Sequence, residues 1–294
     1  MSDLFPRTTV GGVSLPRMII GTNWFLGWSH TTAAKDWFIA THIKGRKWAA
    51  DIIEVFMRAG VDAIMGNIHI KDDPMHDAIK DAQDRTGRKC TIISTPSFPF
   101  SPDVLTEKGW DLDAVARILD KEAAMGSTFL MPHTSTTDCL IDKVLRKIRG
   151  ADVLCRMIRE RGMVPGLSTH EPESIIFADE TGLDVETYIS IFNSMGFLMH
   201  VEVDWVAQVI RNAKKPVMTI KPFAAGQLRP FQALTFAWNA IREQDMITVG
   251  TMSSKEAEEV IEISRNILSR QAVTVKLQET RSKSTIKPKA PVKA

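Results

Sequence analysis

Five of the seven histidines in this chain fall at or just after the ends of predicted strands. They are His30, His69, His133, His170 and His200. Imidazole is the side chain best suited to proton transfer at neutral pH, and it is a common metal ligand. For any single histidine, a hydrogen-bonded structural role is the competing interpretation. As a group they favour an active site, and we predict His133, His69 and His170 as the catalytic residues.

Polar and aromatic side chains gather at the same strand ends and predict a substrate-binding surface. The candidate substrate-binding residues are Asn23, Trp24, Trp28, His30, Asn67, Phe192 and Asn193. Tryptophan beside polar groups can stack on a sugar, and it can equally close the top of a barrel core. Both interpretations remain open at this stage.

A divalent-metal site could be assembled from His69, His133, His170 and a carboxylate. No local ligand spacing such as HExxH or CxxC supports it, so all the ligands would have to converge from separate loops. A metal is therefore the less favoured cofactor.

Lys221 lies at the end of the seventh predicted strand and is the one lysine among these strand-end residues. A desolvated lysine can form a Schiff base, although a Lys-Pro pair at this position more often orients a loop or contacts a phosphate. The loops that contain Gly226 and Gly250, together with the start of the last helix, also predict an anion site.

Short apolar runs alternate with longer amphipathic stretches along the chain, which is typical of βαβ units. The predicted strands are 18–21, 61–66, 90–95, 127–133, 163–170, 187–193, 216–223 and 246–250. Eight strand–helix pairs predict an α/β fold, a (β/α)8 TIM barrel, in which function lies at the C-terminal ends of the strands. A hairpin over 7–18 precedes the barrel. A doubly wound open sheet is the alternative, but no glycine fingerprint follows the first strand.

Composition sets the broad class of the protein. The net charge is +2, but residues 270–294 hold seven Lys or Arg and one Glu, so this tail carries +6 and the rest −4. We expect one barrel domain over 1–269 and a basic, mobile tail over 270–294. Three cysteines without recognisable spacing and the lack of a long apolar stretch predict a cytoplasmic protein with no membrane association. Nucleic acid binding is disfavoured because no aromatic residues interleave the basic tail.

The chain resembles the aldo-keto reductase superfamily over roughly residues 7–265. The matching segments are GTNW after the first strand, GLSTHEPESI at the fifth, KPFAAGQL at the seventh and TVGTMSSKEAEEVIEI at the last. The last segment is similar to the one that holds the adenosine phosphate end of NADP in that family. The resemblance thus implies cofactor-binding roles for Ser168, Lys221, Gly226, Gly250, Ser253 and Ser254.

The residues that carry out reduction in this family do not match. Their Asp falls at Gly66–Asn67, their Lys falls at Pro96, and the single tyrosine, Tyr188, lies in the sixth strand. Only the histidine survives, as His133, and Phe192 matches the aromatic residue that stacks on nicotinamide. Without the Tyr and Lys, no acid is in place to protonate the forming alkoxide.

Three functions follow from these residues. The leading one is a barrel enzyme that acts on a small polar substrate, carbohydrate-like or carbonyl-bearing, by histidine acid–base chemistry in an elimination, isomerisation or hydrolysis. A divergent NADP(H)-dependent oxidoreductase is the first alternative, and a non-catalytic binding or scaffold protein is the second. Solvent-reachable histidines around one point would favour an enzyme, whereas a pocket filled by Trp24, Phe25 and Trp28 would favour a scaffold.

Overall fold

The computed structural model describes residues 4–43, 45–69, 74–101 and 109–274. A parallel sheet forms a nearly closed barrel in strand order β10-β11-β12-β13-β3-β4-β5-β6-β9. Its strands are β3 (Met18–Gly21), β4 (Ala63–Gly66), β5 (Thr91–Ser94), β6 (Ser127–Leu130), β9 (Val164–Pro165), β10 (Leu167–Ser168), β11 (Tyr188–Ile191), β12 (Val217–Ile220) and β13 (Met246–Val249). The predicted (β/α)8 fold is confirmed.

The nine strands occupy eight positions, because β9 and β10 are two halves of one strand interrupted at Gly166. The β9 half pairs with β6, and the β10 half pairs with β11. A Cβ at Gly166 would lie 2.6 Å from the Met131 side chain and 2.8 Å from the Thr187 carbonyl oxygen. A glycine is therefore needed where the strand passes from one neighbour to the other.

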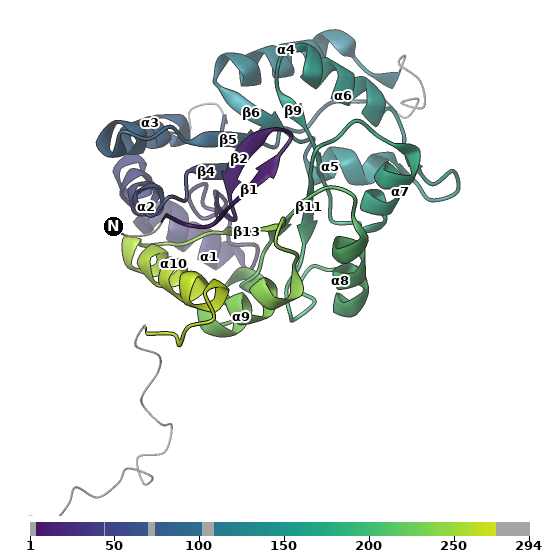
Figure 1. The fold of residues 1–294 in the computed structure, drawn as a ribbon. Coiled ribbons are helices and arrows are strands. Elements are labelled where there is room, and N and C mark those ends of the chain that lie inside the picture. The colour runs from purple at the N-terminus through teal and green to yellow at the C-terminus, as the bar shows by residue number, and fades with distance from the viewer. Residues whose placement is uncertain (1–3, 44, 70–73, 102–108, 275–294) are drawn as a thin grey trace, which may run out of the picture.

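Helices surround the barrel (Figure 1). They are α1 (Ala33–Phe38), α2 (Arg46–Arg58), α3 (Met75–Thr86), α4 (Leu112–Ala124), α5 (Thr134–Thr137), α6 (Ala151–Glu160), α7 (Glu173–Thr181), α8 (Val203–Asn212), α9 (Pro230–Ala240) and α10 (Ser254–Leu268). Apart from α1 and α5, the apolar sides of these helices pack on the outside of the strands in the larger core. Within the described ranges, none of these helices has the length and apolarity needed to cross a membrane.

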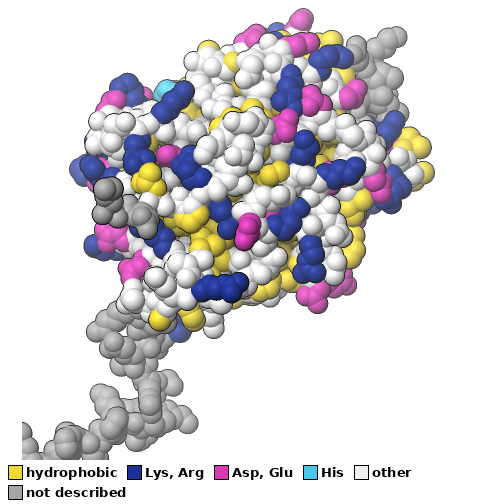
Figure 2. Space-filling model, viewed as in Figure 1, with side chains coloured by type: hydrophobic (Ala, Val, Ile, Leu, Met, Phe, Trp, Pro, Cys, Tyr) yellow, Lys and Arg dark blue, Asp and Glu magenta, His cyan; other side chains and the backbone are white. Residues whose placement is uncertain are grey.

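The hairpin predicted before the first barrel strand is present, and it closes one end of the barrel. It consists of β1 (Arg7–Val10) and β2 (Val13–Pro16), and it lies across that opening in Figure 1. Val10 and Leu15 are buried with the residues inside the barrel, among them Phe129 and Met218. Basic and acidic side chains are interspersed on this face (Figure 2). The opposite end of the barrel, where the strands terminate, is the one at which the candidate site lies.

Two segments between strands are not single continuous helices. Over 33–59, α1 continues into a π-helical segment (Ile39–Ile43) and α2 begins after Gly45. Between 138 and 161, a hairpin of β7 (Ile141–Asp142) and β8 (Lys147–Ile148) precedes α6. The Asp142 carboxylate accepts hydrogen bonds from two turn amides and from Arg149, which stabilises the hairpin. Most of the predicted tail, 275–294, lies outside the described residues.

Candidate active site

A cavity of about 670 Å³ opens at the C-terminal ends of the strands. Its volume is in the range of small-molecule sites. Ten of the predicted site residues line it: Asn23, Trp24, Trp28, His30, His133, Ser168, His170, Lys221, Gly226 and Gly250. The two tryptophans form part of the wall and do not fill the space, while Phe25 is buried against Trp48.

His133 is held in one orientation by the short helix that it begins. It lies at the N-terminal cap of α5, where its Nδ1 accepts a hydrogen bond from the Ser135 backbone N–H at 3.2 Å. Nδ1 is therefore the unprotonated nitrogen, and Nε2 carries the hydrogen. Burial, with a smaller contribution from the charge of Lys221, lowers the pKa of His133. The ring is thus a neutral hydrogen-bond donor at physiological pH.

His170 follows β10 and lines the cavity beside His133. Burial, reinforced by the charge of Lys221 and by the nearby histidines, lowers its pKa to about 4. Within the described part of the chain, its ring makes no hydrogen bond, so both nitrogens are available to a ligand. His170 is accordingly an unprotonated imidazole at neutral pH.

Asp138 ties the loops that carry these two histidines together. Its carboxylate accepts hydrogen bonds from the His170 backbone N–H at 3.1 Å and from the Thr169 hydroxyl at 2.6 Å. The Thr134 hydroxyl, next to His133, also donates to it. Asp138 is not among the residues predicted for the site from the sequence. The sequence indicates a role for Asp138 only through its position, five residues after His133 and at the end of a Ser/Thr-rich run.

His30 forms a further part of the wall, on the loop after β3. The Asn23 side-chain amide lies 2.6 Å from His30 Nε2. Because an amide nitrogen can only donate, Nε2 accepts and Nδ1 carries the hydrogen. Partial desolvation, together with the charge of Lys221, lowers the pKa of His30 to about 4.

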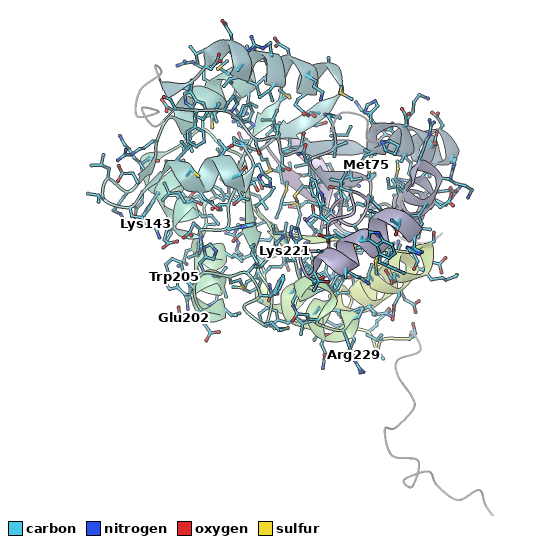
Figure 3. The ribbon with its side chains drawn as sticks, turned by 180° about the vertical axis from the view of Figure 1, so that it is seen from behind. Met75, Lys143, Glu202, Trp205, Lys221 and Arg229 are labelled. Atoms are coloured by element: carbon cyan, nitrogen blue, oxygen red, sulfur yellow. The ribbon has the colours of Figure 1, made fainter. Side chains whose placement is uncertain are left out.

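Lys221 lies directly after β12, and Figure 3 places it near the centre of the barrel. Its backbone is left-handed, with φ at +60°, and Ala224 and Ala225 share that conformation. Left-handed conformations at residues other than glycine cost free energy and concentrate at functional sites. Burial lowers the pKa of the Lys221 ammonium to about 8. Among the described residues, it has no carboxylate partner and no hydrogen bond.

His69 is not part of this cavity, which corrects its predicted catalytic role. Its side chain is fully buried, and Nδ1 lies 2.5 Å from the Glu122 carboxylate of α4. The Ser127 hydroxyl donates to the same carboxylate at 2.9 Å. His200 is also outside the cavity, exposed and paired with Glu171. The strand-end histidines therefore separate into a cavity group and two histidines with structural partners.

Three predicted substrate-binding residues also lie outside the cavity lining. Phe192 is fully buried and packs on Phe236 with ring centroids 5.1 Å apart. Asn193 uses its side chain inside its own loop, where it donates to the Phe197 carbonyl and accepts from two backbone amides. Asn67 is half-buried on the loop between β4 and His69, outside the lining.

The same barrel occurs in solved structures of aldo-keto reductases. A proposed aldo-keto reductase from Pseudomonas aeruginosa aligns over 89% of this chain and 96% of its own, with a TM-score of 0.62 and 14% identity. An aldo-keto reductase from Klebsiella pneumoniae, in complex with NADP and acetate, aligns over 89% and 90%, with a TM-score of 0.56 and 16% identity. The fold is that of the aldo-keto reductase barrel.

The likeness extends beyond reductases. Orotidine 5'-monophosphate decarboxylase from Methanocaldococcus jannaschii aligns over 85% of this chain and 98% of its own, with a TM-score of 0.51 and 13% identity. No protein-family model matches the chain, and no curated protein matches it in sequence. At these identities the comparisons show the fold, and the reaction has to be argued from the site.

The aldo-keto reductase fold implies NADP, but the residues at the expected phosphate corner do not fit it. Ser253 caps α10 by accepting from the Glu256 backbone N–H at 3.1 Å, and the Glu256 carboxylate accepts from the Met252 N–H at 2.6 Å. The Ser254 hydroxyl faces the Asp51 carbonyl oxygen at 3.4 Å. Glu256 and Glu259 line the cavity here. The Ser253 hydroxyl is thus used by the cap of α10 and the Ser254 hydroxyl by the contact with α2, and the nearby carboxylates repel a phosphate.

Neither the single tyrosine nor the candidate metal ligands are placed for redox or metal chemistry in the cavity. The Tyr188 hydroxyl is buried at the start of β11 and donates to Asp179 at 2.7 Å, and burial raises its pKa. It cannot reach the strand ends to act as an acid. Over the described ranges, no three His, Cys, Asp or Glu side chains are grouped to hold a metal ion. The metal site that His69, His133 and His170 could have assembled is not formed by these residues, because His69 lies in the core.

Proposed function

We propose that this chain is an enzyme that acts on a small, polar, carbonyl-bearing substrate by proton transfer between histidines. The observation that carries the proposal is the convergence of His133, His170 and Lys221 on one open cavity at the strand ends. The two imidazoles have nitrogens that no described residue uses, and lowered pKa values keep both rings neutral. Such a group is typical of acid–base catalysis and serves no packing purpose.

The two histidines suit different roles. His133 presents its Nε2–H because Nδ1 is engaged by the Ser135 N–H. It can donate a hydrogen bond to a substrate carbonyl oxygen and stabilise the negative charge that develops there. His170 has two unengaged ring nitrogens and can accept a proton from the carbon beside the carbonyl. Together they support enolisation, and hence isomerisation or elimination.

The rest of the cavity wall suits a hydroxylated substrate. The hydroxyl oxygens of Thr22, Thr248 and Thr251 are buried in the wall without a hydrogen-bond partner among the described residues. A buried polar group without a partner costs free energy, which a polar ligand would offset. Trp24 and Trp28 add flat apolar surfaces that can pack on the C–H faces of such a molecule.

Proton exchange provides a test that does not require the natural substrate. Small hydroxyaldehydes and hydroxyketones are incubated with the protein in D2O, and loss of the C–H signal beside the carbonyl is followed by proton NMR. We expect exchange or product formation with at least one compound, and a loss of about 10²–10⁴-fold in the His133→Ala variant. The matched control is His200→Gln, which removes an exposed histidine outside the cavity. Full activity in His133→Ala would refute the assignment.

A further inference from the structure

We propose that Lys221 forms a Schiff base with the carbonyl group of the substrate, which makes the site one of covalent catalysis. This inference rests on the proposed function, since it names how the same cavity would hold and activate the carbonyl. The amine lies in the wall shared with His133 and His170 and has no competing partner among the described residues.

The position of Lys221 differs from that of the lysines on the surface of the barrel. Lys143, Lys215 and Lys255 each pair with a glutamate within 3.4 Å. A lysine in an ion pair is protonated and cannot attack a carbonyl carbon. Lys221 instead directly follows strand β12, and its left-handed backbone directs the chain at the cavity mouth.

The electrostatic surroundings favour the neutral amine. Burial lowers the pKa of Lys221 to about 8, and no carboxylate of the described residues pairs with the ammonium to raise it again. Coupling also runs the other way, because a charged Lys221 lowers the pKa of all three cavity histidines. With that pKa, about a tenth of the molecules hold a neutral amine at pH 7, which is ample for nucleophilic attack.

The base in the cavity is weak, and a Schiff base would compensate for that weakness. An imidazole with a pKa of about 4 has little power to remove a proton beside an ordinary ketone. A protonated imine is a far stronger electron sink than the carbonyl it replaces, so the neighbouring C–H becomes much more acidic. Imine formation at Lys221 would therefore make the neighbouring C–H proton acidic enough for His170 to remove.

The covalent step balances without any further reactant. The neutral Nζ attacks the carbonyl carbon to form a C–N bond, and the oxygen takes up the proton released by the nitrogen. The carbinolamine oxygen then accepts a second proton from solvent and leaves as water, which gives the protonated imine. Removal of the neighbouring C–H proton by His170 forms an enamine. Return of that proton from His170 to the carbon restores the protonated imine, and addition of water releases the carbonyl compound, the free lysine and a proton to solvent. The Nε2–H of His133 is placed to assist the departing oxygen.

Phosphate contact is the competing role for Lys221. A phosphate-binding lysine stays charged and forms no covalent bond, so reduction with borohydride separates the two roles. The carboxylates of Glu256 and Glu259 on the same cavity oppose a phosphate there.

Trapping with borohydride is the test. The full-length protein is incubated with dihydroxyacetone or glyceraldehyde, reduced with sodium borohydride, and examined by intact mass and peptide mapping. We expect one adduct with the mass of the probe less one oxygen atom, on the peptide that contains Lys221. Lys221→Arg keeps the charge and should reduce trapping to the level without borohydride. Lys215→Arg, which changes a lysine outside the cavity lining that pairs with Glu186, should leave trapping unchanged.

A probe-independent measurement covers the case in which neither sugar fits the cavity. Reductive methylation of the wild-type protein with ¹³C-formaldehyde and cyanoborohydride should modify Lys221 before Lys35. The methylated Lys221 should titrate near pH 8 by NMR. Equal rates at the two lysines, an adduct elsewhere, or titration near the ordinary lysine value would overturn the proposal.

Failure of this inference can be told apart from failure of the proposed function. His133→Ala should lose proton exchange and keep the adduct on Lys221. Exchange that persists in Lys221→Arg would retain histidine catalysis and refute the Schiff base. An adduct in the wild type without any exchange would refute the histidine chemistry and retain the covalent site.

Discussion

His69 and His133 occupy equivalent positions after their strands, but the His69 side chain lies in the core and the His133 side chain lines the cavity. Each lies three residues after the last residue of a barrel strand, β4 in one case and β6 in the other. His133 caps a helical turn and faces the cavity, while His69 is buried against Glu122. A histidine at the end of a strand is therefore only a candidate for catalysis. The partner available to its ring decides its role.

The glycine that ends β4 helps to explain the difference. Gly66 has φ at +150°, and a Cβ there would lie 1.8 Å from the Thr22 hydroxyl oxygen. The chain can therefore turn beside Thr22 at this point and carry His69 towards α4. There the Lys121 ammonium donates to the His69 carbonyl oxygen at 2.6 Å, which fixes the loop to the helix.

The largest expected effect in this comparison is on stability. His69→Ala should lower the free energy of unfolding by about 3–5 kcal/mol, because it leaves the Glu122 carboxylate buried without its imidazole partner. His133→Ala, in a solvent-reachable wall, should change stability little. Urea unfolding followed by circular dichroism measures both. Equal losses in the two variants would erase the distinction between a structural and a catalytic histidine.

A smaller effect is expected from the positioning residue Asp138. Asp138→Asn replaces an acceptor oxygen with a donor and should reduce kcat about tenfold, since the loops of His133 and His170 are no longer tied. The charge of Asp138 also raises the pKa of His133. The acid limb of the pH–rate profile should therefore move to lower pH in the variant. A fall in kcat without that movement would assign Asp138 a purely structural role.

The pH dependence of stability should come from the cavity histidines. His30 and His170 have folded-state pKa values of about 4, below the ordinary 6.5. Between these values the unfolded chain binds protons that the folded chain does not, so stability falls as pH decreases from 6.5 towards 4. In the double variant His30→Gln/His170→Gln, the midpoint of thermal unfolding should change less between pH 6.5 and 5. An unchanged pH dependence would contradict the assigned pKa values.

The smallest effect is expected from NADPH. Trp24 lies against Gly250 in the cavity, so its fluorescence reports a ligand bound there. We expect no saturable quenching at millimolar NADPH, because Glu256 and Glu259 face the position of the phosphate. Glu256→Gln/Glu259→Gln is the matched variant, in which any residual affinity should rise. Tight binding by the wild type would instead favour the oxidoreductase alternative.

The barrel and most of the cavity wall can be predicted from the sequence. The alternation of apolar runs with amphipathic stretches specifies the period of each element, and parallel strands place their C-terminal ends at one face. His133, His170 and Lys221 could be chosen for that reason alone. The strand break at Gly166 was not predicted, because it depends on the close approach of Met131 and Thr187.

Tertiary structure alone decided which of these residues work together. His69 pairs with Glu122, Tyr188 with Asp179, and Phe192 with Phe236. Each of these partners is distant in the chain or lies on another element. Likewise, the lowered pKa of Lys221 arises from burial by several loops and not from its neighbours in the sequence. Local periodicity predicts the strand or helix on which a residue lies. Its partners and its access to water depend on the packing of the whole barrel.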